Sequence, residues 1–316
     1  MSDADTSAES PPGHRPLVIV GLDRAVAAAL LAPGRADERA DWGRRLDDFA
    51  DAILVGADLV LPGHSGPWGE KRTERGGIDP SLAAIVLAAV TSRAGLLVAA
   101  SPLRDHPYNL ARRIAGLDHA SRGRAGLAIA PTDPRAPTGS PWTSAVPDAA
   151  AADAVIAVRE LWRSFPADAV IADPARGVFA ESERIVAIDH RGAFDIDGPL
   201  QLPSGPQVWP PVVTFGEPSP DLARVADLVV TESDREVVVH HPRDVDELAD
   251  LLTGTASTSV DQDVLRDGAV SGALPTPTLR DLLGLAAVRL PTGGRILFPA
   301  AETDTRQPVG ANSHVR

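Results

Sequence analysis

Three side chains with chemistry suited to a substrate pocket stand in loops that follow short apolar runs of the sequence. They are His64, His106 and Trp142. Histidine changes its charge near neutral pH, so either histidine could transfer a proton. An exposed loop histidine more often has no chemical role, and only the position of these two favours a functional interpretation. We therefore treat the three residues as candidates for a substrate pocket and leave the catalytic residue unassigned.

A second pair of histidines, His240 and His241, adjoins the end of an apolar run. Neighbouring residues of a strand point to opposite faces, so this pair does not favour one shared metal ion. The chain has no cysteine, which excludes disulfide bonds, thiol nucleophiles and thiolate metal ligands. We predict no metal site.

The elements that must position these residues are clearest between residues 79 and 132. A run of good helix formers there begins at a proline and is apolar on every face, which is typical of a buried helix. Short apolar runs follow it, with the length of buried parallel strands. The predicted order is helix 81–92, strand 96–100, helix 108–120 and strand 125–130. This alternation predicts an α/β fold with a parallel sheet.

The rest of the chain continues the alternation. Before residue 79 we predict a strand over 17–20, a helix over 37–50 and a strand over 52–55. After residue 132 we predict a helix over 148–165, a hairpin around Gly192 and Gly198, strands over 212–215, 228–230 and 237–239, and a helix over 243–252.

The stretch 79–132 also carries a resemblance. Its sequences LAAVTSRAGLLVAAS and PYNLARRIAGLDHASRGRAGLAIAPT are similar to the bacterial luciferase-like superfamily, in particular the branch that contains nitrilotriacetate monooxygenase and dibenzothiophene-sulfone monooxygenase. Later segments agree in the same order, among them IDHRGAFDIDGPLQLP, PQVWPPVVTFG and ADLVVT. The resemblance implies a (β/α)8 TIM barrel. It also implies a barrel shortened in its C-terminal half, because much of the segment between ADLVVT and TLRDLLGL is absent.

The function that the resemblance implies is a two-component monooxygenase. Reduced FMN from a separate flavin reductase would activate oxygen to oxidise a small organic substrate. On the family's pattern the cofactor contacts fall on Ser101, Thr132, Gly216 and Ser219. Ser101 would bond the flavin ring, and the loop from Gly216 to Ser219 would hold the phosphate near a helix N-terminus. From the residues alone, Ser101 could equally cap the turn before Pro102, and Ser219 could be a helix N-cap.

Some positions depart from the family pattern on the cofactor side. Ala128 stands in place of an Asn, and Asp148 stands where the family presents an aromatic residue. Glu217 and Asp221 bracket Ser219 and would repel a phosphate. We therefore expect weak or lost FMN binding. Two functions stay open: a flavin-dependent monooxygenase, which we favour, and a non-catalytic pseudoenzyme or inactive subunit of a heterodimer with an intact paralogue.

Length and composition bound the domain organisation. A chain of 316 residues exceeds the ~250 of a typical barrel and could hold two domains, but the regular alternation favours one, over residues 16–299. Residues 1–15 and 300–316 are rich in Ser, Asp, Thr, Pro and Gly, which predicts disordered tails. The apolar residues of helices 81–92 and 108–120 exceed what one inner face can absorb, and in the family this region lies at a dimer interface. We expect a homodimer or a heterodimer with a paralogue.

The charge and hydropathy of the sequence exclude several partners. The formal net charge of −13 argues against nucleic acid and against an anionic membrane surface. The longest apolar run, residues 82–90, is far short of the ~20 residues that span a bilayer. The first 14 residues are polar and Pro-rich, so no secretory segment is predicted. We expect a cytoplasmic protein.

Overall fold

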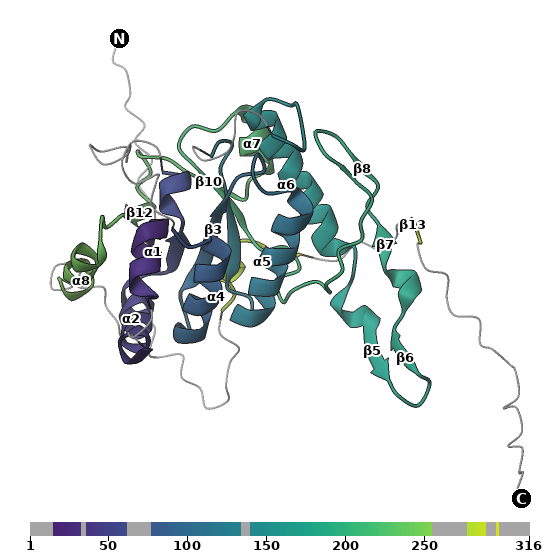
Figure 1. Ribbon diagram of the computed structural model, residues 1–316, viewed down its shortest axis with the longest axis horizontal. Coiled ribbons are helices and arrows are strands. Elements are labelled where there is room, and N and C mark those ends of the chain that lie inside the picture. Colours follow the sequence, from purple (N-terminus) through teal and green to yellow (C-terminus); the bar gives the residue numbers. More distant parts are fainter. Residues whose placement is uncertain are drawn as a thin grey trace, which may run out of the picture.

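Seven parallel strands form one strongly curved sheet, and helices cover its outer face (Figure 1). The computed structural model describes residues 15–32, 36–61, 77–133, 140–254, 277–288 and 295–296. Along the sheet the strands follow chain order, and the last returns to pair with the first, so that a nearly closed barrel results. The strands are β1 (Leu17–Leu22), β2 (Ala52–Val55), β3 (Gly95–Ala100), β4 (Ala125–Ile129), β10 (Val212–Phe215), β11 (Leu228–Val230) and β12 (Val237–His240). The predicted α/β barrel is confirmed.

The strands are apolar on both faces because the sheet is covered on both. In β3, Leu97 and Ala99 belong to the cluster that fills the barrel, whereas Leu96 and Val98 belong to the cluster between the sheet and the helices. All four are nearly inaccessible to solvent. A parallel sheet buried on both faces has continuous apolar strands. That is why the strands could be located from the sequence, including the pairing of β3 with β4.

Local signals set where the outer helices begin. Asp79 caps α4, where its carboxylate accepts a hydrogen bond from Ser81 N at 2.9 Å, and Pro80 takes the first helical position. The helices in the described ranges are α1 (Arg24–Leu30), α2 (Ala36–Phe49), α4 (Pro80–Val90), α5 (Pro107–Ser121), α6 (Pro147–Arg163), α7 (Pro220–Val225), α8 (Val245–Thr253) and α10 (Leu279–Leu282). The predicted helices are confirmed to within a few residues, including a helix directly after Ser219 (α7); α1 and α10 were not predicted.

The C-terminal half of the barrel is shortened, as predicted. Only residues 231–236 connect β11 to β12, although both strands run in the same direction as the rest of the sheet. A crossover between parallel strands usually needs a dozen or more residues and a helix. The short connection returns to the start of β12 without a helix, and no strand among the described residues pairs with the second edge of β11.

The amino ends of the strands are closed by α10. Leu279 belongs to the apolar cluster inside the barrel. A Cβ on Gly95 would lie 2.4 Å from Leu279 Cδ1, and one on Gly126 would lie 2.7 Å from Leu279 Cδ2. Both glycines are therefore needed for the Leu279 side chain to enter the barrel. Thr278 and Asp281 form a capping box that fixes the start of α10.

Between α6 and β10 the chain leaves the barrel and forms an insertion beside it (Figure 1). The insertion holds β5 (Val170–Asp173), β6 (Val178–Ala180), β7 (Val186–Ala187), β8 (His190–Arg191) and β9 (Asp195–Ile196), with short 3-10 turns η2 (Ala167–Ala169) and η3 (Ser182–Arg184). β8 and β9 form the predicted hairpin around Gly192, whereas the β5–β6 hairpin was not predicted. β13 (Arg295–Ile296) pairs with β7. The predicted tails lie outside the described residues apart from Arg15.

No helix within the described ranges combines the length and apolarity that a membrane span requires.

Candidate functional site

The carboxyl ends of the parallel strands form the mouth of the barrel, where barrel enzymes place their active sites. The residues that the strands deliver there include Asp23 after β1, Ser101 after β3 and His241 after β12. Thr132 lies in the loop after β4, and Gly216 directly follows β10. The positions predicted to contact a cofactor are therefore at the mouth, on neighbouring strands.

Ser101 continues the inward-facing positions Leu97 and Ala99 of β3 and is fully buried. Its Oγ accepts a hydrogen bond from Leu103 N at 3.4 Å, and its carbonyl accepts one from Arg104 N at 3.2 Å. These bonds close the turn after β3, in agreement with the capping interpretation. A contact between Ser101 and a flavin ring stays a prediction.

A short 3-10 turn, η1 (Ala57–Leu59), follows β2 and brings apolar side chains into the mouth. Leu59 and Val60 are each 8% exposed and belong to the same buried cluster as the inward-facing side chains of the strands. Gly56 permits the turn because its φ is +84° and a Cβ there would lie 2.7 Å from Pro80 Cγ. Apolar side chains of the protein itself therefore lie at the carboxyl end of β2, beside the mouth.

An ion pair holds η1 in this position. Arg24, at the start of α1, is 5% exposed and contacts Asp58 of η1, with Nη2 at 2.6 Å and Nε at 2.8 Å from Oδ2. The backbone N–H of Arg24 also donates to Asp58 Oδ1 at 3.0 Å. These three contacts to one carboxylate hold the turn against α1. Moving the turn away would leave the buried Arg24 without its counter-ion, which is costly.

A histidine and a carboxylate meet at the mouth on the neighbouring strands. His241 Nε2 lies 2.6 Å from Asp23 Oδ1, and both side chains are largely buried. His240 points the other way, as expected, and its ring packs edge-on against Phe49 with centroids 5.3 Å apart. The Asp23–His241 pair could hold or transfer a proton. The sequence analysis missed this pair because 218 positions separate the two residues. The signal that could have found it is that each residue follows one of two strands, β1 and β12, that pair with each other.

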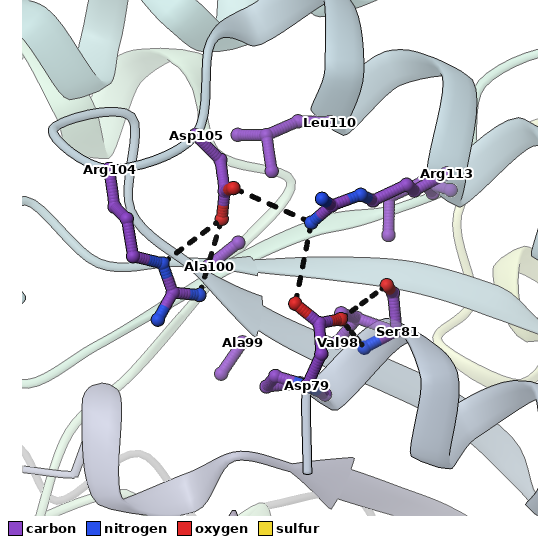
Figure 2. Close-up of a pocket in the computed structure, with 11 residues that line it drawn as sticks. Asp79, Ser81, Val98, Ala99, Ala100, Arg104, Asp105, Leu110 and Arg113 are labelled. Carbon is purple, nitrogen blue, oxygen red and sulfur yellow. Dashed lines mark hydrogen bonds and ion pairs between the residues drawn. The ribbon is translucent and has the colours of Figure 1, made fainter. Parts of the chain in front are cut away.

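A series of alternating charges joins the start of α4, α5 and the loop after β3 (Figure 2), and Asp133 extends it to the loop after β4. Arg113 lies 3.4 Å from both Asp79 and Asp105, and Arg104 lies 3.2 Å from both Asp105 and Asp133. Burial would raise the pKa of Asp79, but hydrogen bonds from Ser81 and the charge of Arg113 outweigh it and lower that pKa. The cavity that most of these residues line measures about 10 Å³, close to the space for one water. These ion pairs connect the start of α4, α5 and the loops after β3 and β4. The cavity beside them is too small for an organic substrate.

Two of the three predicted pocket residues come together at the mouth. The rings of His106 and Trp142 are 5.4 Å apart and nearly perpendicular, and Phe194 of the insertion packs on the same histidine at 5.9 Å. His106 Nδ1 accepts a hydrogen bond from Tyr108 N at 3.2 Å, and burial lowers the pKa of His106, so the ring favours the neutral form that can accept this bond. His64 lies outside the described residues.

The turn that was predicted to bind phosphate leads into a short helix, and its serine caps that helix. Gly216 has φ of +77°, and Ser219 Oγ accepts a hydrogen bond from Leu222 N at 3.3 Å as the N-cap of α7. α7 has only six residues, and Glu217 beside it is exposed. Thr132 is also exposed. This geometry agrees with the N-cap interpretation of Ser219, and its contact with a phosphate stays a prediction.

The described residues at the mouth, which leave out 62–76 and 134–139, do not fit FMN. Leu59, Val60, Ala128 and Phe215 belong to one buried apolar cluster and offer no polar group to a flavin. Glu217 and Asp221 flank Ser219, and carboxylates repel an anion of nearly two charges, although Asp221 pairs with Arg224. Within the described ranges, no three His, Asp or Glu side chains cluster closely enough to hold a metal ion.

Comparison with known proteins identifies the family. Residues 56–230, more than half of the chain, match the luciferase-like monooxygenase family. The chain is 32% identical over 222 residues to a pristinamycin IIA synthase subunit of Streptomyces pristinaespiralis, which covers 69% of this chain and 68% of that relative. It is 33% identical over 145 residues to dibenzothiophene-sulfone monooxygenase of Rhodococcus erythropolis, covering 44% of this chain but 32% of the relative. Nitrilotriacetate monooxygenase component A of Aminobacter aminovorans is 32% identical over 169 residues, which cover 49% of this chain and 36% of that relative. The chain thus spans about a third of the length of these two monooxygenases.

Solved structures agree on the fold. DmoA from Hyphomicrobium sulfonivorans superposes with a TM-score of 0.54 at 20% identity, over 85% of this chain and 76% of that one. A long-chain alkane monooxygenase superposes with a TM-score of 0.54 at 19% identity, over 69% of this chain and 56% of that one. The resemblance found in the sequence is confirmed, and the chain belongs to the luciferase-like monooxygenase family.

Proposed function

We propose that this protein works in a two-component flavin-dependent monooxygenase as a subunit that does not itself hold FMN, beside a paralogous subunit that does. The complete enzyme would oxidise a small organic substrate with oxygen and with FMN reduced by a separate flavin reductase. The observation that supports the proposal is the burial of Leu59 and Val60, directly after β2, in the apolar cluster inside the barrel. It stands together with Glu217 and Asp221 on either side of Ser219.

A relative supports the role of a subunit. The pristinamycin IIA synthase relative is, by its name, one part of a larger synthase, and the match covers about two thirds of both chains. The monooxygenases named above match over shorter stretches, and they are much longer than the part they share with this chain.

The outer face of α4 is a suitable contact surface for the paralogous subunit. Leu82 and Ile85 are 61% and 42% exposed, and Ala89 extends the same face one turn further. Residues three and four apart lie on one side of a helix, so these side chains form a continuous apolar strip. Contiguous apolar surface on a helix is a candidate for a protein contact. It supports the expectation of a homodimer or a heterodimer.

The Asp23–His241 pair favours a second candidate, a monooxygenase that is active by itself. A buried histidine and carboxylate at a barrel mouth could serve proton transfer to a bound substrate. This function requires η1 to leave the mouth when reduced FMN binds. The Arg24–Asp58 ion pair opposes that movement.

A flavin titration separates the two candidates. The purified chain is titrated with oxidised FMN, and with reduced FMN under anaerobic conditions, by flavin fluorescence and calorimetry. We expect no saturable binding to the chain alone, and flavin binding only when a flavin-binding paralogue is added. Tight binding of reduced FMN to the chain alone, with oxygen-dependent turnover, would restore the active monooxygenase and refute the subunit role.

A further inference from the structure

Two arginines share one carboxylate beside the amino ends of β10 and β11, at the end of the barrel opposite the mouth. Asp227 directly precedes β11. Its Oδ2 lies 2.7 Å from Arg159 Nη2 of α6, and its Oδ1 lies 4.0 Å from Arg280 Nη1 of α10. Asp227 Oδ2 also accepts a hydrogen bond from Val212 N at 2.8 Å. This carboxylate therefore serves two guanidinium groups and a backbone N–H.

A third arginine, Arg163 at the end of α6, has no carboxylate of its own. Arg163 Cζ is 4.9 Å from the centre of the Trp209 ring, and Arg159 Cζ is 5.2 Å from the centre of the same ring. Within the described ranges, this cation–π contact is the one polar interaction that the Arg163 head group makes. Its Nε is buried and has no hydrogen-bond partner there. Arg163 is therefore a half-buried cation without a counter-ion.

The charges of this cluster do not balance. Arg159 and Arg163 are four positions apart on one helix face, where like charges repel each other. Burial is the main cause that lowers the pKa of Arg280, while Asp227 and Asp281 raise that pKa and the charge of Arg159 lowers it. Three guanidinium groups thus face two carboxylates, and one positive charge is left over. In a chain with a net charge of −13, this excess is local to the end of α6.

The surroundings of Arg163 favour an organic carboxylate as its counter-ion. A guanidinium presents its N–H groups in a planar fork that matches the two oxygens of a carboxylate. The partly exposed indole ring of Trp209 adjoins the charge. An acid with an apolar body gains contact with this ring, whereas a strongly hydrated inorganic ion does not. One unpaired positive charge also matches an anion of one charge.

We propose that Arg163 and Trp209 form a binding site for a small organic acid, whose carboxylate binds the Arg163 guanidinium and whose apolar body lies against the indole ring. Trp209 is fixed at two points, because its Nε1 donates to Arg159 O at 3.2 Å and its carbonyl accepts a hydrogen bond from Arg280 Nη1 at 3.1 Å. Arg159 and Arg280 are held by Asp227 and position the ring. The site lies away from the barrel mouth, so it does not depend on the function proposed above.

Nuclear magnetic resonance with benzoate tests the site. The chain has five tryptophans, and the indole N–H signal of Trp209 is assigned by its loss in Trp209→Phe. At constant ionic strength, benzoate should shift the Trp209 signal with saturation and leave the other four unchanged. Benzamide, which has the same ring without the charge, should not shift it. No saturable shift with benzoate, an equal shift with benzamide, or tighter binding of inorganic phosphate would overturn the proposal.

Substitutions then test the role of the unpaired charge. Arg163→Gln should weaken benzoate binding about tenfold or more, as expected for the loss of a charge-assisted hydrogen bond. Arg224→Gln is the matched control, because it removes the same charge from an exposed arginine that pairs with Asp221, and binding should be unchanged. Arg163→Lys keeps the charge without the fork and should bind with intermediate affinity. Equal weakening in Arg163→Gln and Arg224→Gln would mean that net charge alone matters and would overturn the site. Thermal denaturation without benzoate checks that each variant is folded.

Discussion

His190 lies between two carboxylates and joins the insertion to α6. Its Nδ1 is 2.8 Å from Glu160 and its Nε2 is 3.1 Å from Asp153. Burial alone would lower the pKa of His190, but its hydrogen bonds to Asp153 and Glu160 outweigh burial and raise the pKa. The charged ring therefore stabilises the folded state fully below the unfolded pKa of about 6.5, and the contribution is lost as pH rises through the folded pKa.

The first prediction follows from this pair of contacts. His190→Gln should lower the free energy of unfolding by about 1.5–3 kcal/mol at pH 6, the range for hydrogen bonds to charged groups, and by less at pH 8. Urea denaturation at the two pH values measures the difference. His119→Gln, at an exposed histidine, is the control. A loss that is equal at both pH values would contradict the assignment of a charged His190.

The second prediction concerns the ion pair that holds η1. Asp58→Ala should destabilise the fold by about 3 kcal/mol, because it leaves Arg24 buried without its counter-ion. Asp221→Ala removes the partner of Arg224 in a pair whose side chains are about 70% exposed, and it should cost less than about 1 kcal/mol. Thermal denaturation of both variants measures the two losses of stability, which we expect to differ. Similar losses would mean that burial does not strengthen the Arg24 contact.

For single residues, the sequence predicted where a side chain lies in the barrel better than which side chain it contacts. His106 and Trp142 could be placed at the mouth because both follow apolar strands, and the structure brings them together. The Arg24–Asp58 and Asp23–His241 pairs could not be predicted, because each depends on which strands become neighbours. The roles of Ser101 and Ser219 were open in the sequence because a serine hydroxyl suits a turn and a ligand equally well.

Among the elements, the tightest fit is between α10 and the barrel. A Cβ on Gly126 would lie 2.7 Å from the side chains of both Leu279 and Leu97. We predict that Gly126→Ala lowers the free energy of unfolding by about 1–3 kcal/mol through overpacking. Gly116→Ala is the matched control: it lies inside α5, and nothing is within 4 Å of its Cβ. That change should instead stabilise by up to about 1 kcal/mol, as is usual for glycine to alanine in a helix. Chemical denaturation of both variants tests the opposite signs.

The long elements were predictable because their signals are local and repeated. The apolar runs of β3 and β4 and the capped starts of α4 and α5 agree with the fold that they form. The β5–β6 hairpin was missed for the opposite reason: it is short, half exposed, and lacks a buried face. η1 was missed because only the packed barrel reveals that a three-residue turn lies beside its mouth.

For the whole molecule, the expected contact with a second subunit can be tested at α4. Leu82→Glu should abolish association with a homologous or paralogous subunit, because it places a charge in an apolar contact, while leaving the fold unchanged. Phe179→Glu is the matched control, since Phe179 is 68% exposed on β6 in the insertion. Sedimentation velocity of the wild type and both variants gives the result. Equal association in all three would exclude the α4 face as the contact surface.

The six-residue return between β11 and β12 determines where this barrel opens first. β11 has three residues and, within the described ranges, a single paired edge, whereas β3 is paired on both sides. A strand that is paired on one side has fewer hydrogen bonds to break than a strand paired on both sides. We therefore expect local opening of the sheet to start at β11. Amide protons of β11 will therefore be lost to solvent long before those of β3, and heat-induced unfolding will begin on the side opposite α4 and α5. The α4 face, which we propose as the contact surface, lies away from β11 and β12, so opening between these two strands would leave a bound subunit in place.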